Sequence, residues 1–243
     1  MNGKAIIKFL VVIAAIIGLF AYFIQPLAGS LKQGLDLQGG THIVLEAEDS
    51  ATGTADNDAV ERAKQILERR INEMGLSEPL VQREGARRII IELPGVKDPD
   101  EAIKRIGKTA VLEFKNDQGQ TVMTGDDLKD AKEELGQNKQ PLVAIELSDE
   151  GAKKFADLTS KNIGRRIAIT LDGKELTNPV VQQAITGGKA TISGSQSLEE
   201  AKDLAILLRS GALPVKINVL EVRTVGPSLG QDSKDKSVVA LSA

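Results

Sequence analysis

An apolar run near the N-terminus constrains this chain more than any other feature. Residues 5–24 read AIIKFLVVIAAIIGLFAYFI and carry a single charge, Lys8. As a helix, about 20 residues span roughly 30 Å, which matches the hydrocarbon core of a bilayer. The run therefore predicts a transmembrane helix.

The basic residues around this run predict its orientation. Lys4 and Lys8 lie at its start, and the next basic residue is Lys32, so we expect a cytoplasmic N-terminus and an extracytoplasmic main domain. A cleaved secretory signal is the alternative, because small residues follow the run, but Leu27 makes a poor cleavage site. We expect a single-pass protein of the cell membrane, in which residues 1–33 form the cytoplasmic tip, the anchor and a linker.

Composition argues against several classes of function. The chain carries 31 basic and 34 acidic residues, a formal net charge of -3, which does not suit nucleic-acid binding. It has no cysteine and one histidine, His42, so Cys-His nucleophilic sites and His/Cys zinc clusters are excluded. We predict no catalytic residue, no cofactor and no metal, and hence no enzyme.

The first half of the exported part shows regular alternation and clear helix boundaries. The order of its elements is βαββαβ, which typically folds as a split βαβ, ferredoxin-like sheet with both helices on one face. The predicted elements are a strand over 41–47, a helix over 57–74 capped by Asp56 or Thr54, a hairpin of PLVQR and RRIIIEL, a helix over 99–106 and a strand over 110–114.

A polar zone follows, in which we predict one short helix from Asp126 to Leu135; its acidic side chains would form a solvated helix face. A similar order of elements then nearly recurs. It comprises strand 142–147, a helix from Ser148 to about Asn162, strand 167–171, a turn at Asp172-Gly173, strand 189–193, a helix from Ser197 to Gly211, and strand 214–222. Two interpretations stay open: a duplicated module, or one sheet interrupted by an insert that precedes its last helix and strand.

The stretch GLDLQGG places three glycines, an Asp and a Gln before the first strand. Its residues are Gly34, Leu35, Asp36, Leu37, Gln38, Gly39 and Gly40. It lacks the strand before, the helix after and the Lys-Ser/Thr of a phosphate-binding loop. The simplest interpretation is a flexible or positive-φ entry into the strand.

Four separated blocks resemble one family. They are GLDLQGGTHIVLEAE, ERRINEMGLSEPLVQREGARRIIIELPGV, LSDEGAKKFADLTSKNIGRRIAITLDGKELTNPVVQQAITGG and LLRSGALPVKINVLEVRTVGPSLGQDS, and they are similar to the SecD family of bacterial protein export. The resemblance implies an α+β fold: an N-terminal transmembrane helix, then a ferredoxin-like base with an inserted α+β head. It favours the inserted interpretation, with the base at 34–114 and 196–223, the head at 115–195, and 224–243 leading toward further membrane helices.

The resemblance also implies function. It indicates an accessory subunit of the Sec export machinery whose head contacts unfolded preprotein and which, in the full-length family, couples the proton motive force to translocation. The implied partners are SecF, the SecYEG translocon, YidC- or YajC-like accessory proteins and membrane lipid. Alternatives are an assembly module that does not touch preprotein, or an exported ligand-binding domain.

The resemblance gives two groups of candidate residues. In the head, the candidates for preprotein contact are Pro179, Val180, Val181 and Ile185. At the junction of anchor and base, Asp36 and Gln38 would hydrogen-bond the base or a partner domain. The sequence as given ends SKDKSVVALSA, without the family's later membrane helices, so we expect that it does not itself conduct protons.

Overall fold

A computed structural model describes residue 13 and residues 39–49, 53–76, 79–96 and 98–226. The predicted transmembrane span, apart from Ile13, and junction residues 34–38 lie outside this range. Within the described part of the chain, no helix is long and apolar enough to cross a bilayer. The described residues mix helices with antiparallel sheets, so the α+β class is confirmed.

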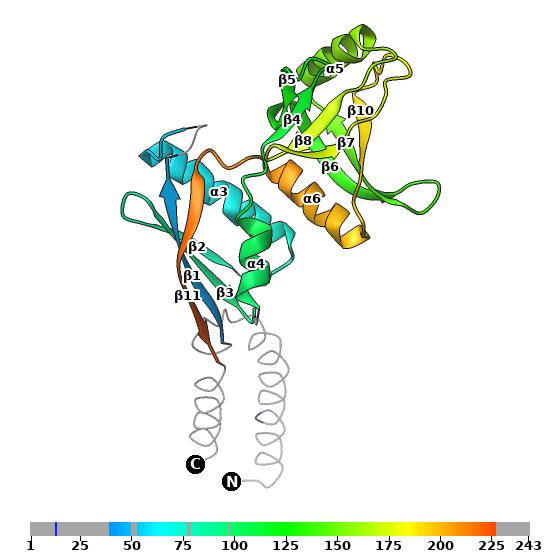
Figure 1. The fold of residues 1–243 in the computed structure, drawn as a ribbon. Helices are drawn as coiled ribbons and strands as arrows, with labels where there is room; N and C mark the ends of the chain where they lie inside the picture. The colour runs from blue at the N-terminus through cyan, green and yellow to red at the C-terminus, as the bar shows by residue number, and fades with distance from the viewer. Residues whose placement is uncertain (1–12, 14–38, 50–52, 77–78, 97, 227–243) are drawn as a thin grey trace, which may run out of the picture.

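The first of two structural units is a sheet with two helices on one face (Figure 1). Its hydrogen-bonded strand order is β11-β1-β3-β2, and all neighbours are antiparallel. We call it the first unit (residues 40–106 and 213–225). Its elements are β1 (Gly40–Glu48), α3 (Asn57–Glu73), β2 (Leu80–Glu84), β3 (Arg88–Pro94), α4 (Pro99–Ile106) and β11 (Lys216–Val225).

The sequence pattern explains the core of the first unit. On β1, Ile43, Leu45 and Ala47 alternate into the core as predicted, and each is at most 2% exposed. Burying one such Ile or Leu stabilises the fold by about 1.5–3 kcal/mol. At the start of α3, the Asp56 carboxylate accepts a hydrogen bond from the Ala59 N–H, which confirms one of the two predicted caps.

The second unit (residues 112–210) contains two further antiparallel sheets. Their strand orders are β10-β7-β6 and β5-β4-β8-β9. Inside, Phe114 and Phe155 meet edge to face with ring centroids 6.0 Å apart. The elements are β4 (Leu112–Lys115), β5 (Thr121–Thr124), a 3₁₀ turn η1 (Gly125–Asp127), β6 (Leu128–Leu135), β7 (Pro141–Leu147), α5 (Asp149–Lys161), β8 (Ala168–Leu171), β9 (Lys174–Thr177), β10 (Lys189–Ser193) and α6 (Leu198–Ser210).

The predicted helix from Asp126 to Leu135 is wrong. The segment forms the 3₁₀ turn η1 and then strand β6, which pairs with β7. Its composition favours a helix locally, but ladder hydrogen bonds to β7 and burial of Ala131 stabilise a strand. Asp130, Glu133 and Glu134 therefore lie on a strand and not on a solvated helix face.

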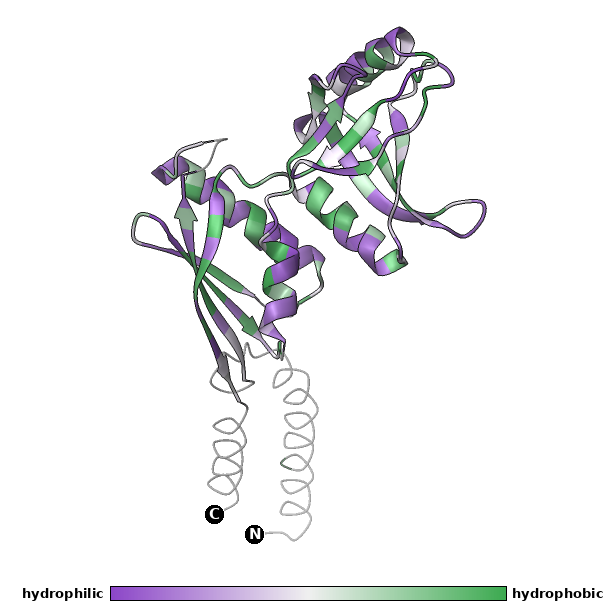
Figure 2. Cartoon of the chain, viewed as in Figure 1, coloured by the Kyte–Doolittle hydropathy of each residue, from purple (hydrophilic) through white to green (hydrophobic). Residues whose placement is uncertain are grey.

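The hydrophobic clusters also divide the chain differently from the expected boundaries at 114 and 196. Residues of β4 and α6, which were expected in the base, pack in the core of the second unit. The reason for α6 is its apolar residues, which colour much of this helix green in Figure 2. Among them, Ala201, Leu204 and Leu208 belong to that core. The chain thus leaves the first unit at 107–111 and returns at 211–212, and only β11 completes the first sheet.

Candidate functional site: a groove in the second unit

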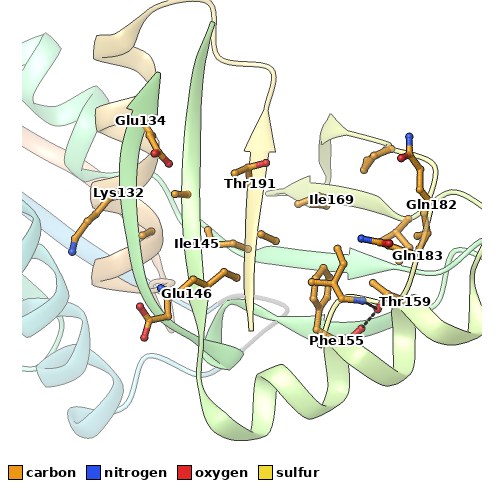
Figure 3. A pocket seen from close by; sticks show the side chains of 18 of the residues that line it. Lys132, Glu134, Ile145, Glu146, Phe155, Thr159, Ile169, Gln182, Gln183 and Thr191 are labelled. Atoms are coloured by element: carbon orange, nitrogen blue, oxygen red, sulfur yellow. Dashed lines mark hydrogen bonds between the residues drawn. The ribbon is translucent and has the colours of Figure 1, made fainter. Parts of the chain in front are cut away.

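A groove of about 770 Å³ opens in the second unit. Strands β6, β7 and β10 border one side, and α5 with segment 179–185 borders the other, as Figure 3 shows. Several of its lining residues belong to the hydrophobic core: Ala131, Ile145, Phe155, Ile167, Ile169 and Val181. The groove therefore combines apolar core residues with access from solvent.

Segment 179–185 is irregular in backbone but held by hydrogen bonds. The Ile167 N–H donates to the Pro179 carbonyl over 3.1 Å, and the Val181 N–H donates to the Arg165 carbonyl over 2.9 Å. At its far end, the Ile185 N–H donates to the Thr159 hydroxyl over 3.0 Å (Figure 3). These bonds give the groove a defined wall although it is not a regular strand.

The four residues predicted in the head lie together in this wall. Pro179, Val180, Val181 and Ile185 all line the groove. Val181 is 8% exposed, whereas Val180 is 46% exposed and presents its side chain to solvent. Nearby Ile163, bridged to Val181, is 55% exposed. The result is an apolar rim beside the groove.

The strand side of the groove is polar, and it was not predicted from the sequence. Strand register aligns Asp130 with Glu146 and Glu146 with Lys189, so these residues share one face. A hydrogen bond from the Lys129 ammonium lowers the pKa of Glu146, and one from Lys132 lowers the pKa of Asp130. Both carboxylates are therefore ionised and paired, and the wall has little net charge.

This wall went unrecognised because β6 was predicted as a helix. Ala131 is the one buried residue of β6, and a single small apolar residue is a weak strand pattern. The amide side chains of Gln182 and Gln183 and the Thr191 hydroxyl add further hydrogen-bonding groups around the groove.

The glycine stretch lies elsewhere, at the end of the first sheet. Gly39 and Gly40 have φ of 69° and 147°, so a positive-φ entry into β1 is confirmed there. The Gly39 carbonyl accepts a hydrogen bond from the Gly95 N–H over 3.0 Å. Gly40 pairs with Pro94 and Val225, where β3 and β11 end. The structure does not bring these glycines near the groove (Figure 1).

The arrangement offers binding surfaces rather than reacting groups. Among the described residues, no group of three or more His, Cys, Asp or Glu side chains is placed to hold a metal ion. Lysines engage the groove carboxylates of Asp130 and Glu146. The other polar groups of the lining are the charged side chains of Glu134 and Lys189, together with amides and hydroxyls. Such a site suits an extended polypeptide, whose backbone needs hydrogen bonds and whose side chains need apolar contact.

Family models match three parts of the chain. The model described as "SecDF, P1 head subdomain" matches residues 103–215, "Protein translocase subunit SecDF, P1 domain, N-terminal" matches 60–119, and "SecD/SecF GG Motif" matches 31–51. The first of these contains the whole second unit, and the last contains the glycine stretch.

Individual relatives agree with the family models. Protein translocase subunit SecD of Acidaminococcus fermentans is 57% identical over 242 residues, which cover 100% of this chain and 58% of that protein. A crystal structure of SecDF in a super-membrane-facing form matches with a TM-score of 0.75 at 41% identity, over 87% of this chain and 34% of that one. A structure described as "a membrane component SecDF that enhances protein export" matches with a TM-score of 0.68 at 40% identity, over 75% of this chain and 99% of that one.

The chain spans about half the length of the curated relatives it matches, between 51% and 58% for three of them. Identity at this level over nearly the whole chain, together with the similar fold, is specific to one family. The chain therefore belongs to the SecD/SecDF family of protein translocase subunits.

Proposed function

We propose that the groove of the second unit holds a short extended stretch of unfolded preprotein outside the membrane during export. The observation that carries the proposal is the apolar rim of Ile163 and Val180 beside an open groove with hydrogen-bonding walls. Exposed apolar surface of this kind marks interaction sites. Its aliphatic character favours weak contact with many sequences, which a protein that meets every exported chain requires.

We propose the expected organisation around this site as well. The path β1-α3-β2-β3-α4-β11 with sheet order β11-β1-β3-β2 supports a ferredoxin-like base. An anchor at residues 5–24 would hold it to the cell membrane with a cytoplasmic N-terminus. In the whole protein, the partners would be SecF, the SecYEG translocon and YidC- or YajC-like proteins, and the proton motive force would drive movement without enzymatic chemistry.

Site-specific crosslinking tests preprotein contact. The chain has no cysteine, so a single Val180→Cys variant places one crosslinker at the groove. Val122→Cys is the matched control, because Val122 is 42% exposed against 46% for Val180 but does not line the groove. We expect adducts to a translocation-arrested preprotein from Val180→Cys and not from Val122→Cys. Equal labelling by both, or adducts only to stable partners, would refute the proposal.

A second function is favoured by one observation on the first unit. Val219, Leu220 and Val222 are exposed apolar residues on β11, which is an edge strand of its sheet. An edge strand with such side chains can dock another domain, as an assembly module would need. Leu220→Lys is expected to reduce co-purification with SecF while leaving Val180→Cys adducts to preprotein unchanged.

The glycine stretch is proposed as a coupling junction between anchor and base, with Asp36 and Gln38 bonding the base or a partner domain. Its support is the tight backbone at Gly39 and Gly40 where three strands meet. Replacing Asp36 and Gln38 by Ala is expected to impair export in a complementation assay without lowering the thermal stability. Normal export by this variant would rule out the coupling role.

A further inference from the structure

Strand β10 lies at the edge of its sheet and borders the groove. Its one neighbour in that sheet is β7, so its other side forms no ladder within the described part of the chain. Lys189 and Thr191 of this strand line the groove and are exposed. Natural proteins usually block such an edge with proline, charges or a covering segment, but β10 carries one lysine and no proline.

The register of β10 against β7 shows which of its main-chain groups are free. The Leu147 N–H donates to the Gly188 carbonyl over 2.8 Å, so Gly188 is bonded to β7. In an antiparallel pair, bonded positions alternate with positions whose N–H and C=O point to the opposite side. Ala190 therefore bonds β7, whereas Lys189 and Thr191 direct their main-chain groups away from it. We call these two residues the free edge of β10.

The opposite border of the groove is also a strand edge. β9 is the last strand of its sheet, and segment 179–185 follows it along the chain. At one end the two edges meet, since the Thr177 and Ser193 hydroxyls lie 3.3 Å apart. Farther along, Val180 forms an antiparallel bridge with Arg166, and the hydrogen bonds flank this bridge, so the main-chain groups of Val180 point away from Arg166. The groove lies where the two edges separate.

Apolar side chains line the groove between these two edges. Ile145, Phe155 and Ile169 all belong to this lining and are at most 6% exposed. Figure 3 shows Ile169 and Gln182 across the groove from Thr191. Successive side chains of a strand point to opposite faces. A chain that lay along β10 would therefore direct every second side chain toward the apolar lining and the others toward polar groups and solvent.

We propose, on the basis of the function proposed for the groove, that unfolded preprotein lies in it as an added β-strand, paired through its main chain with the free edge of β10. The segments that bind best are extended, alternate apolar with polar side chains and contain no proline in the paired stretch. Main-chain pairing accepts many sequences, because every residue except proline offers the same donor and acceptor.

The free edge also sets the length of the paired stretch. β10 has five residues, which span roughly 17 Å in an extended strand. Lys189 and Thr191 each offer one N–H and one C=O to the added strand. Pairing over so short a stretch gives a contact that forms and breaks readily, as a chain that has to keep moving requires.

Substitutions at one position separate main-chain binding from side-chain binding. Thr191→Pro removes the outward N–H, and an edge strand accepts proline where its N–H faces solvent, so we expect a nearly unchanged Tm. Thr191→Val is the matched control, because it keeps the N–H and removes only the hydroxyl. Ala190→Pro removes a hydrogen bond to β7 and is expected to lower the Tm, which checks the alternation along the strand.

Binding is measured on the full chain in detergent by the fluorescence anisotropy of a short labelled peptide of alternating valine and threonine with lysines at its ends. We expect Thr191→Val to bind this peptide as the unsubstituted chain does, and Thr191→Pro to raise the Kd by about tenfold. In the unsubstituted chain, saturating peptide is expected to slow hydrogen exchange of the Thr191 amide by about tenfold, since pairing replaces water at that N–H. The Ile192 amide, bonded to β7, should exchange slowly with and without peptide.

Equal losses of affinity for Thr191→Pro and Thr191→Val would overturn the added strand in favour of side-chain contact. Unchanged exchange at Thr191 with bound peptide would also overturn it, and this measurement needs no substitution, so it holds whether or not Thr191→Pro folds. In both cases Val180→Cys adducts to preprotein would leave the groove function standing. No peptide binding and no such adducts would refute both. A dimer that Thr191→Pro dissociates, without peptide binding, would assign the edge to a second copy of the chain and overturn the pairing with preprotein.

Discussion

Arg70 of α3 is buried, and its guanidinium donates hydrogen bonds to both segments that connect the two units, at residues 106–108 and 210–211. Replacing Arg70 by Met removes all of these donors at once. Methionine fills similar space but donates no hydrogen bond. The carbonyls of Ile106, Lys108 and Gly211 and the Ser210 hydroxyl would lose the guanidinium donors. Because the site is buried, water does not readily replace these donors.

The expected cost follows from two opposing effects. A hydrogen bond from a charged donor contributes about 1.5–3 kcal/mol, so losing the four bonds of Arg70 at about 1.5–2 kcal/mol each, the lower part of that range, costs on the order of 6–8 kcal/mol. Relief of the buried charge offsets part of this, since burial lowers the pKa of Arg70 to about 10, a fall that corresponds to roughly 3 kcal/mol. The net loss is about 3–5 kcal/mol, in the range found when one partner of a buried charged network is removed.

Differential scanning calorimetry of Arg70→Met measures this loss. For a protein of this size, 1 kcal/mol shifts the Tm by about 2–4 °C, so we expect a drop of roughly 10 °C. Arg69→Met is the matched control: the adjacent arginine is exposed, and its replacement is expected to change stability by less than about 0.5 kcal/mol. Equal Tm values for the two variants would refute the role assigned to the guanidinium.

Three further changes test other parts of the fold. Gly151→Ala should lower the Tm although Ala favours helices by about 1 kcal/mol, because its Cβ would lie 2.3 Å from the Asp127 carbonyl oxygen; a higher Tm would contradict this contact. Thr159→Val leaves the Ile185 N–H without its acceptor, so we expect a loss of about 1–2 kcal/mol and faster hydrogen exchange at that amide, and unchanged exchange would argue against the bond. A hydrogen bond from the Lys115 ammonium, on the same strand, lowers the pKa of Glu113 below its usual value of 4.5. The stabilisation that ionised Glu113 gives the fold is therefore present above about pH 4.5 and is lost as the pH falls. The Tm of the unsubstituted protein should therefore fall more steeply below that pH than the Tm of Glu113→Gln, and parallel curves would contradict the assignment.

Local signals were sufficient to predict most of the first unit. Alternation placed Ile43 and Leu45 on the inner face of β1, and Asp56 together with Gly75 bounded α3. These features act within a few residues of the chain, so a sequence pattern carries them directly.

Contacts between distant segments explain what could not be predicted. β6 is a strand because it pairs with β7, while its own residues favour a helix. For α6, the sequence predicted a helix from Ser197 to Gly211 and the resemblance placed it in the base, but local signals do not say which sheet a helix will meet. Strand β6 borders the groove, so the strand side of the groove was not predicted, whereas the candidates Pro179 and Val180 came from the family resemblance and line the opposite wall.

The burial of Arg70 could have been inferred from its position in the sequence. It lies three residues after Leu67 and four before Met74, on the apolar stripe of α3. A charged residue in such a position indicates a buried partner, but the pattern does not say that the partners are main-chain carbonyls near residues 106 and 211.

The pairing of β1 with β11 has a consequence for the order in which the chain folds. β1 begins at Gly40, whereas its neighbour begins at Lys216. A polypeptide made from its N-terminus onward exposes one edge of β1 until that last strand has been synthesised. Closure of the first sheet therefore requires a pairing of very high sequence separation, which slows folding, and the inserted residues have the opportunity to fold before their host does.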